Sequence, residues 1–308
     1  MLKDITPILA GADIAFGNLE GPLIDGGTTS KCPTIKPVEP TDTKEPPKPI
    51  RCFAFRTPTR YGKYLKDAGF DVLSLANNHS LDFGDQGRIS TRKVLDSLGI
   101  AHAGSDRANH AMTIVEAEGK TIAFVGFAHN AIVPNVNDLT SASKLVRQAK
   151  NKADIVVVSF HGGAEGEKAQ HVPRAMELYV GEKRGNLPLF ARTVVDAGAD
   201  LVLGHGPHVL RGMEIYKDRL ILYSMGNFAT YGMFNLKGAQ GLTAIFEIKL
   251  GPDGKFLAGK IHGGKQLARG IPSLDNSGEA VRKLRTLSQA DFPGTAPKIA
   301  EDGTISIK

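Results

Sequence analysis

Five short apolar runs in this chain each end in side chains that can ligate a metal or form hydrogen bonds. Each run is rich in Val, Ile and Leu and nearly continuous, which predicts a strand buried on both faces. The runs and their polar ends are IAFGNLE with Asn18 and Glu20, VLSLANNH with Asn77, Asn78 and His79, IVVVSFHGGAE with His161 and Glu165, LVLGHGPH with His205 and His208, and LILYSMGN with Asn227. Because loops that leave the carboxyl ends of parallel strands line one crevice, we expect these residues to meet there.

Helical patterns alternate with strand patterns through most of the chain. Helix-like spacing is found in residues 58–70, 84–100, 141–153 and 186–199, and strand-like runs follow at 71–77, 120–128, 154–160 and 200–204. This order is typical of β-α-β units with parallel strand pairing.

After residue 218 the pattern changes. The strand-like runs 219–227, 241–250 and 255–264 follow one another, and the turn GPDGK joins the last two. These features predict an antiparallel hairpin that covers or extends the sheet. One amphipathic helix over 279–290 and a final strand-like TISIK complete the chain. We therefore expect a mixed α/β fold, with no internal repeat.

Composition is that of an ordinary globular protein, with 41% apolar and 23% charged residues among 308. The net charge of +6 and the pI near 9.2 fit an anionic substrate, a cell-wall polymer or nucleic acid. The basic residues are scattered, tryptophan is absent and the aromatic residues are not spaced for base stacking, which argues against nucleic acid. No run approaches the roughly 18 apolar residues of a membrane span. The apolar stretch within the first residues is too short for a signal peptide.

The two cysteines bracket a proline-rich insertion. Cys32 and Cys52 enclose six of the 17 prolines, so we interpret residues 25–52 as an extended surface loop. A disulfide across it would contribute on the order of 3 kcal/mol and would persist only in an oxidising compartment. Two free thiols are the alternative, but neither cysteine lies inside an apolar run, where free cysteines are usually found.

Two segments carry the strongest chemical signal. GHGPH presents His205 and His208 on a glycine-rich turn directly after a buried strand, and His161 ends a matching strand, which predicts a metal site. In NNHSLD an asparagine amide oxygen could ligate, His79 could give or take a proton, and Asp82 could orient that ring. An asparagine-rich turn alone would explain the amides but not the histidine.

The remaining candidates each have a plain structural alternative. Glu20 could bridge two ions, and its apolar neighbours argue against a solvated surface carboxylate. Glu165 could act as a base near the metals or could belong to a solvated face. Asn227 could contact substrate or could hold backbone groups through its amide. Arg211 could bind an anionic oxygen or simply pair with Glu214.

In their order and spacing, FGNLEGPL, AGFDVLSLANNHSLDFG, VVVSFHGGAE, GHGPHVLRGMEIY and LILYSMGNF resemble the bacterial CapA capsule-synthesis family, also called poly-gamma-glutamate biosynthesis proteins, of the calcineurin-like metallophosphoesterase superfamily. The resemblance covers roughly residues 10 to 250. It implies a metallo-dependent phosphatase-like fold, a four-layer α/β/β/α sandwich with a dinuclear metal site at the strand ends. It also implies a domain over 1–265, with 266–308 as a C-terminal helix and tail.

The resemblance further assigns roles to residues. The metal ligands would be Glu20, Asn78, His161, His205 and His208, with Glu20 at the place of a bridging aspartate. His79 would handle the proton, with Asp82 beside it. Substrate contacts or supports for the ligands would come from Asn18, Asn77, Glu165, Arg211 and Asn227.

Two departures from the family pattern stand out. The superfamily begins with a strand that ends in Gly-Asp, and no such motif precedes AGAD here, so the first strand of the sandwich is expected to be missing. A displaced start or a pseudoenzyme would explain this, and two divalent ions are expected only in the full-length protein. The family also commonly has His-Trp-Gly where this chain has His161, Gly162 and Gly163.

Two functions follow as hypotheses. The first is a metal-dependent hydrolase or transferase that acts on a phosphate ester or a cell-surface polymer, outside the cytoplasm. The second is a non-catalytic component of capsule or wall assembly or export that binds an anionic polymer in the same cleft. Two firmly bound metals with turnover would favour the first, and a metal-poor polyanion binder the second.

Overall fold

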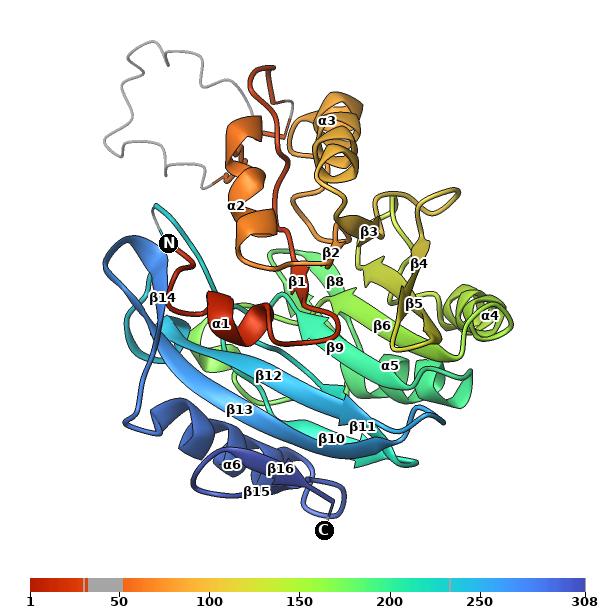
Figure 1. The fold of residues 1–308 in the computed structure, drawn as a ribbon, viewed down its shortest axis with the longest axis vertical. Helices are drawn as coiled ribbons and strands as arrows, with labels where there is room; N and C mark the ends of the chain where they lie inside the picture. Colours follow the sequence, from red (N-terminus) through yellow and green to blue (C-terminus); the bar gives the residue numbers. More distant parts are fainter. Residues whose placement is uncertain (30, 33–51, 233, 308) are drawn as a thin grey trace, which may run out of the picture.

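The computed structural model describes residues 1–29, 31–32, 52–232 and 234–307 (Figure 1). In this part of the chain the α-helices are α1 (Thr6–Leu9), α2 (Lys63–Asp67), α3 (Gly84–Ser97), α4 (Leu139–Lys150), α5 (Leu187–Asp196) and α6 (Glu279–Asp291). Each predicted helix is present, although the first breaks into a 3₁₀ turn at Thr59–Tyr61 followed by the short α2.

A six-stranded sheet forms the centre, in the order β10-β11-β9-β6-β5-β4. Its members are β4 (Met112–Ala117), β5 (Lys120–Ala128), β6 (Ile155–His161), β9 (Leu201–His205), β10 (Met213–Tyr216) and β11 (Arg219–Leu222). The four inner strands are parallel, and β4 and β10 add antiparallel edges. The expected parallel pairing is confirmed.

The five polar-ended runs do not share one sheet, which corrects the simplest form of the prediction. β1 (Phe16–Asn18), β2 (Val72–Ser74) and β3 (Ala101–Ala103) make a separate parallel sheet in the order β1-β2-β3. The two sheets still touch, because the ring of Phe16 stacks on that of Phe124 at 5.6 Å between centroids. The strand ends therefore converge from two sheets rather than one.

The third sheet contains the predicted hairpin. β12 (Leu242–Leu250) pairs antiparallel with β13 (Phe256–Leu267), and β14 (Ile271–Leu274), β15 (Lys298–Ile299) and β16 (Thr304–Ser306) extend it. Both β14 and β16 pair with β13. The predicted boundary after residue 265 falls inside β13, so the C-terminal segment is hydrogen-bonded into the same sheet, and the division into two units stays a prediction.

Alternating side chains of the central sheet face two different cores. On one face Val125, Val158 and Val202 pack against α4 and α5, and on the other Phe124, Val157 and Leu203 pack against β1, β2, β12 and β13. The outer face of the small sheet is covered by α1, α2 and α3, as Figure 1 shows for α1 beside β12 and for α2 and α3 over β2. The order α/β/β/α of the predicted sandwich is confirmed, with α6 packed between β10 and β13.

Two strands of the second β layer have an open edge among the described residues. β1 pairs only with β2, and β12 pairs along its length only with β13, apart from one bridge between Gly226 and Thr243. An open strand edge leaves backbone N–H and C=O groups without ladder partners.

The disulfide between Cys32 and Cys52 is present, with the Cα atoms 5.6 Å apart. The prediction that the two cysteines pair is thereby confirmed. The whole segment that they enclose, residues 33–51, lies outside the described residues. Within the part of the chain that is described, none of the helices has the length and apolar character needed to cross a membrane.

A buried carboxylate ties the C-terminal segment to the central sheet. Glu214 on β10 is fully buried and accepts hydrogen bonds from Arg192, Tyr223 and Thr295. Burial raises the pKa of Glu214, but these three donors outweigh burial and leave its pKa below the usual range. The carboxylate is therefore ionised in the fold and joins α5, β11 and the segment after α6.

We expect Glu214→Gln to lower the free energy of unfolding by about 1–3 kcal/mol, because the neutral amide cannot satisfy the three donors. A carboxyl group with a lowered pKa stabilises the fold above its unfolded pKa, and this contribution is lost as the pH falls below it. The difference between variant and wild type in urea unfolding should therefore shrink below about pH 4.5. Glu301→Gln, at an exposed turn, is the control; an equal loss in both variants would contradict the assignment.

Candidate functional site

The carboxylate of Glu20, just after β1, lies at the centre of the candidate site. Its Oε1 atom is 3.7 Å from Nε2 of His208, 3.9 Å from Nε2 of His79 and 4.0 Å from Nε2 of His161. These histidines follow or end three different strands, β2, β6 and β9. The structure thus brings together residues that are far apart in sequence, as the strand-end pattern predicts.

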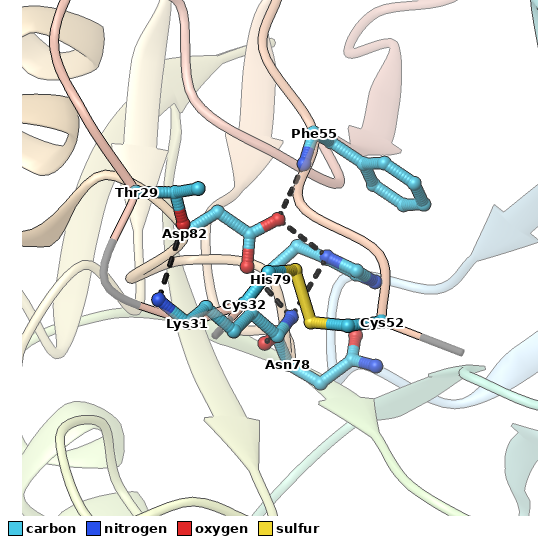
Figure 2. Close-up of a disulfide and its surroundings, with 8 residues drawn as sticks. All are labelled: Thr29, Lys31, Cys32, Cys52, Phe55, Asn78, His79 and Asp82. Carbon is cyan, nitrogen blue, oxygen red and sulfur yellow. Dashed lines mark hydrogen bonds and ion pairs between the residues drawn. A yellow bond between two sulfur atoms is a disulfide. The ribbon is translucent and has the colours of Figure 1, made fainter. Parts of the chain in front are cut away.

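His79 is oriented by the carboxylate that the sequence suggested. Nδ1 of His79 lies 2.6 Å from Oδ2 of Asp82, which is fully buried, and the ring of Phe55 stacks on the imidazole at 3.8 Å between centroids (Figure 2). An ionised carboxylate only accepts hydrogen bonds, so Nδ1–H donates to Asp82. Nε2 therefore faces Glu20 and the interior of the site.

His161 and His205 are neighbours by strand register. His161 ends β6, His205 ends β9, and the two residues pair across the parallel strands. Burial lowers the pKa of His205 to about 3. Burial also lowers the pKa of His161 well below its usual range, and nearby histidines and Arg184 lower it further. Both rings are neutral at neutral pH, which is the form that ligates metals.

His208 is placed by an unusual backbone conformation. Its φ of 58° lies in the left-handed region, and Gly206 before it also has a positive φ, with an added Cβ only 2.6 Å from the carbonyl oxygen of Gly162. This tight turn needs glycine, as GHGPH indicated. Nδ1 of His208 contacts Oδ1 of Asn227 at 2.9 Å, and the Asn227 amide donates to the carbonyl of Gln240. Asn227 thereby orients an imidazole and clamps backbone together.

Asn18 and Asn77 support the turn that carries His79. The Asn77 side chain donates to Oδ1 of Asn18 and to the carbonyl of Leu19, and its own Oδ1 accepts from the backbone N–H of His79. Asn78 differs, because its Oδ1 is buried without a hydrogen-bond partner among the described residues. The Asn77 amide therefore shapes the loop, whereas the Asn78 amide has an acceptor oxygen that no described residue uses.

Arg211 does not reach the site as suggested. It is fully buried and forms a bidentate ion pair with Glu177, not with Glu214, and it also donates to the carbonyls of Ala164 and Ala169. These contacts engage all three guanidinium nitrogens of a side chain that has no exposure to solvent, so a contact of Arg211 with substrate stays a prediction that this arrangement does not support. Glu165 stays at the site: its Oε1 accepts from Arg184 at 2.8 Å, and its Oε2 lies 3.8 Å from Nε2 of His208.

The ligand atoms at the site fit a divalent ion in their chemistry. Buried atoms without a hydrogen-bond partner in the described chain include Oε1 of Glu20, Oδ1 of Asn78, both ring nitrogens of His161 and Nε2 of His205. Ligand atoms that share one ion at about 2.1 Å each can be at most about 4.2 Å apart, and the distances from Glu20 to His161 and to His208 lie within this limit. As they stand, however, no three His, Cys, Asp or Glu residues in the described ranges are arranged to hold a metal ion.

Comparison with known proteins identifies the family. The sequence model of the bacterial capsule synthesis protein family, PGA_cap, matches residues 1–231. The chain belongs to this family. It is 33% identical over 239 residues to the PGA biosynthesis protein CapA of Bacillus subtilis (strain 168), over 73% of this chain and 55% of that protein. It is 30% identical over 246 residues to the capsule biosynthesis protein CapA of Bacillus anthracis, over 74% of this chain and 53% of that protein.

The chain thus spans about half the length of the capsule synthesis proteins that it matches. Among solved structures, a phosphatase from Mycoplasma pneumoniae gives a TM-score of 0.46 at 13% identity, over 73% of this chain and 79% of the phosphatase. A likeness at this level carries no argument about the activity of this PGA_cap protein.

Three residues near the site were missed by the sequence analysis. His129 follows β5, and its Nδ1 is 3.4 Å from the carbonyl oxygen of His161; the rule applied to the other strand ends would have found it. Arg184 on β8 (Glu182–Gly185), paired with β7 (Glu177–Tyr179), binds Glu165. Lys31, in the proline-rich insertion, contacts Asp82 at 2.6 Å, and no periodic pattern marks it.

The β7–β8 hairpin also explains one departure of this PGA_cap chain from its family pattern. A Cβ atom at Gly162 would lie 2.6 Å from the carbonyl oxygen of Arg184. The backbone of β8 thus occupies the space next to His161 that a tryptophan side chain would need. The hairpin therefore leaves no room for a larger side chain at position 162.

We expect the metal-free protein to lose stability as the pH falls from about 6.5 toward about 3, because His205 stays neutral in the fold while the unfolded chain binds a proton. Unfolding free energy therefore rises with pH across this window. Urea unfolding in a chelator at about pH 5 and about pH 7 measures the effect. His205→Gln should reduce the pH difference, and exposed His171→Gln should keep it; a pH-independent wild type would refute the claim.

Proposed function

We propose that this chain is a capsule or cell-surface polymer biosynthesis protein that acts outside the cytoplasm as a metal-dependent hydrolase or transferase on a phosphate ester or an anionic polymer. Family membership and the capsule-related names of its relatives support the general role. The net charge of +6 favours an anionic substrate. The disulfide supports an oxidising compartment.

The proposal rests mainly on the group of possible metal-ligand atoms around Glu20 that are buried and have no hydrogen-bond partner in the described chain. Leaving a buried polar atom without a partner costs about 1–3 kcal/mol, so several at one place favour a bound group that satisfies them. Neutral imidazoles, a carboxylate and an amide oxygen are ligands of divalent transition metals. Glu20, Asn78, His161, His205 and His208 would hold the ion or ions.

When bound, such an ion would act as a Lewis acid on a substrate oxygen. The chain's own residues supply the proton chemistry. Asp82 holds the His79 ring through Nδ1, which leaves Nε2 to give a proton to a leaving group or to take one. Glu165, held by Arg184, lies beside His208 and is the second carboxylate that faces the site.

A non-catalytic binder is the alternative. Such a protein would bind an anionic polymer in the same cleft for assembly or export and would need no turnover. Metal analysis of the purified chain, combined with hydrolysis of bis(4-nitrophenyl) phosphate and binding of poly-gamma-glutamate, separates the two. Tight metal with turnover supports the enzyme, and a metal-poor protein that binds the polymer without turnover supports the binder.

We expect His205→Ala and His208→Ala each to abolish tight metal binding, because each removes an imidazole from the proposed set of ligands. Metal content after dialysis against buffer without metal measures the result. His171→Ala removes an exposed histidine outside the site and serves as the control. Unchanged occupancy in both site variants would remove the assignment.

For His79→Ala we expect nearly normal metal content with turnover reduced by a factor on the order of 10² or more, because a general acid is lost rather than a ligand. The test is to measure metal content and kcat on the same preparation. If metal and turnover fell together, His79 would be a ligand.

A further inference from the structure

A single buried carboxylate connects the disulfide-closed insertion to His79 (Figure 2). Asp82 accepts hydrogen bonds of 2.6 Å from three donors: Nζ of Lys31 on Oδ1, and Nδ1 of His79 and the backbone N–H of Phe55 on Oδ2. Its side chain has no exposure to solvent. Lys31 is therefore the cation that balances a buried negative charge directly beside His79.

The ammonium group of Lys31 is committed to these contacts. Besides Asp82, Nζ donates to the carbonyl of Asn78 at 3.2 Å, and it also lies 3.1 Å from Nδ1 of His79. Because the Nδ1 proton is donated to Asp82, this nitrogen cannot also accept from Lys31. Lys31 thus acts on the imidazole through Asp82 and the backbone of Asn78, and two of its three hydrogens are already used.

Both ends of the closed loop support the same imidazole. Lys31 immediately precedes Cys32, and Phe55, three residues after Cys52, stacks on the ring of His79 with 21° between the planes. The disulfide joins the two cysteines, so the position of the ammonium group and that of the phenyl ring are linked covalently. Without that bond, a segment of 19 residues would separate Cys32 from Cys52 with no link between its ends.

We propose that Lys31 is a positioning residue for His79, and that the Cys32–Cys52 disulfide keeps it there, so that the site responds to reduction of this bond. This inference rests on the proposed role of His79 in proton transfer. Without the ammonium group, Oδ1 of Asp82 loses its charged partner, and the carboxylate can turn away from the ring. Support of this kind is typically worth 10- to 100-fold in activity.

The chemical step is reduction of the sulfur–sulfur bond by a phosphine in water. The phosphine gives up two electrons and gains the oxygen of water, the bond between the two sulfurs breaks, and the two protons of water end on the Cys32 and Cys52 thiols. Tris(2-carboxyethyl)phosphine, removed by desalting before assay, is a suitable reagent.

The test compares Lys31→Met, which keeps the length but removes the charge, Lys31→Arg, which keeps a charge, and the double variant Cys32→Ser/Cys52→Ser. Lys63→Met, which removes an exposed lysine of α2, is the control. Metal content, kcat and KM for bis(4-nitrophenyl) phosphate, and the urea midpoint are measured for each protein before and after reduction.

We expect Lys31→Met to lower kcat by about 10- to 100-fold, with KM and metal content unchanged, and Lys31→Arg to restore part of it. Reduced wild type and the double cysteine variant should show the same loss, and reduction should change Lys31→Met no further. A kcat within about twofold of wild type for Lys31→Met would overturn the proposal. So would a rise in KM alone, which would make Lys31 a substrate contact.

A readout independent of turnover separates this inference from the proposed function. In proton NMR the His79 Nδ1–H that donates to Asp82 should give a slowly exchanging imidazole signal, assigned by its loss in His79→Gln. We expect Lys31→Met and reduction each to broaden or remove it, while Lys63→Met keeps it. If wild type shows no turnover, the proposed function fails, and persistence of this signal in Lys31→Met would then overturn the positioning role by itself.

Discussion

The structure of the site depends on one constraint, which is that a carboxylate and several imidazoles share a buried space with too few hydrogen-bond partners in the described chain. Glu20 has Nε2 atoms of three histidines within 4.0 Å, and buried atoms of His161 and His205 have no partner there. Such an arrangement is costly unless something satisfies it. The surrounding fold can hold it because each group is fixed from behind: His79 by Asp82, His208 by Asn227, and His161 and His205 by the parallel register of β6 and β9.

Much of the fold was predictable because its signals are local. The apolar runs of β5, β6 and β9 and the punctuated helices between them have strong periodicity, and the GPDGK turn fixed the β12–β13 hairpin. The division of the strands between two sheets was not predictable. A continuous apolar run shows that both faces are buried, but it does not say which neighbour a strand pairs with. β1 and β2 lie in apolar runs like that of β6, yet they pair in a separate sheet, and Phe16 of β1 stacks on Phe124.

Site residues marked by a local sequence pattern were also predictable, and those defined by a long-range contact were not. Most of the site residues at strand ends were found, because topology alone brings strand ends together; His129, which follows β5, is the exception. The ion-pair partner of Arg211 was not found, because Glu177 lies 34 residues away on a hairpin that has no clear sequence pattern. Lys31 was missed for a related reason. It lies in a segment whose composition reads as a solvated loop, and only the contacts of Asp82, 51 residues later, give it a role.

The β7–β8 hairpin and the disulfide-closed insertion have parallel effects on the site. The hairpin brings Arg184 against Glu165 and closes the space beside Gly162. The insertion brings Lys31 against Asp82 and Phe55 against His79. In both cases a basic residue from a connecting segment neutralises a carboxylate next to a histidine that faces Glu20. The histidines and Glu20 come from strand ends, so the sheets hold them in place. The hairpin and the insertion set the charge around these groups.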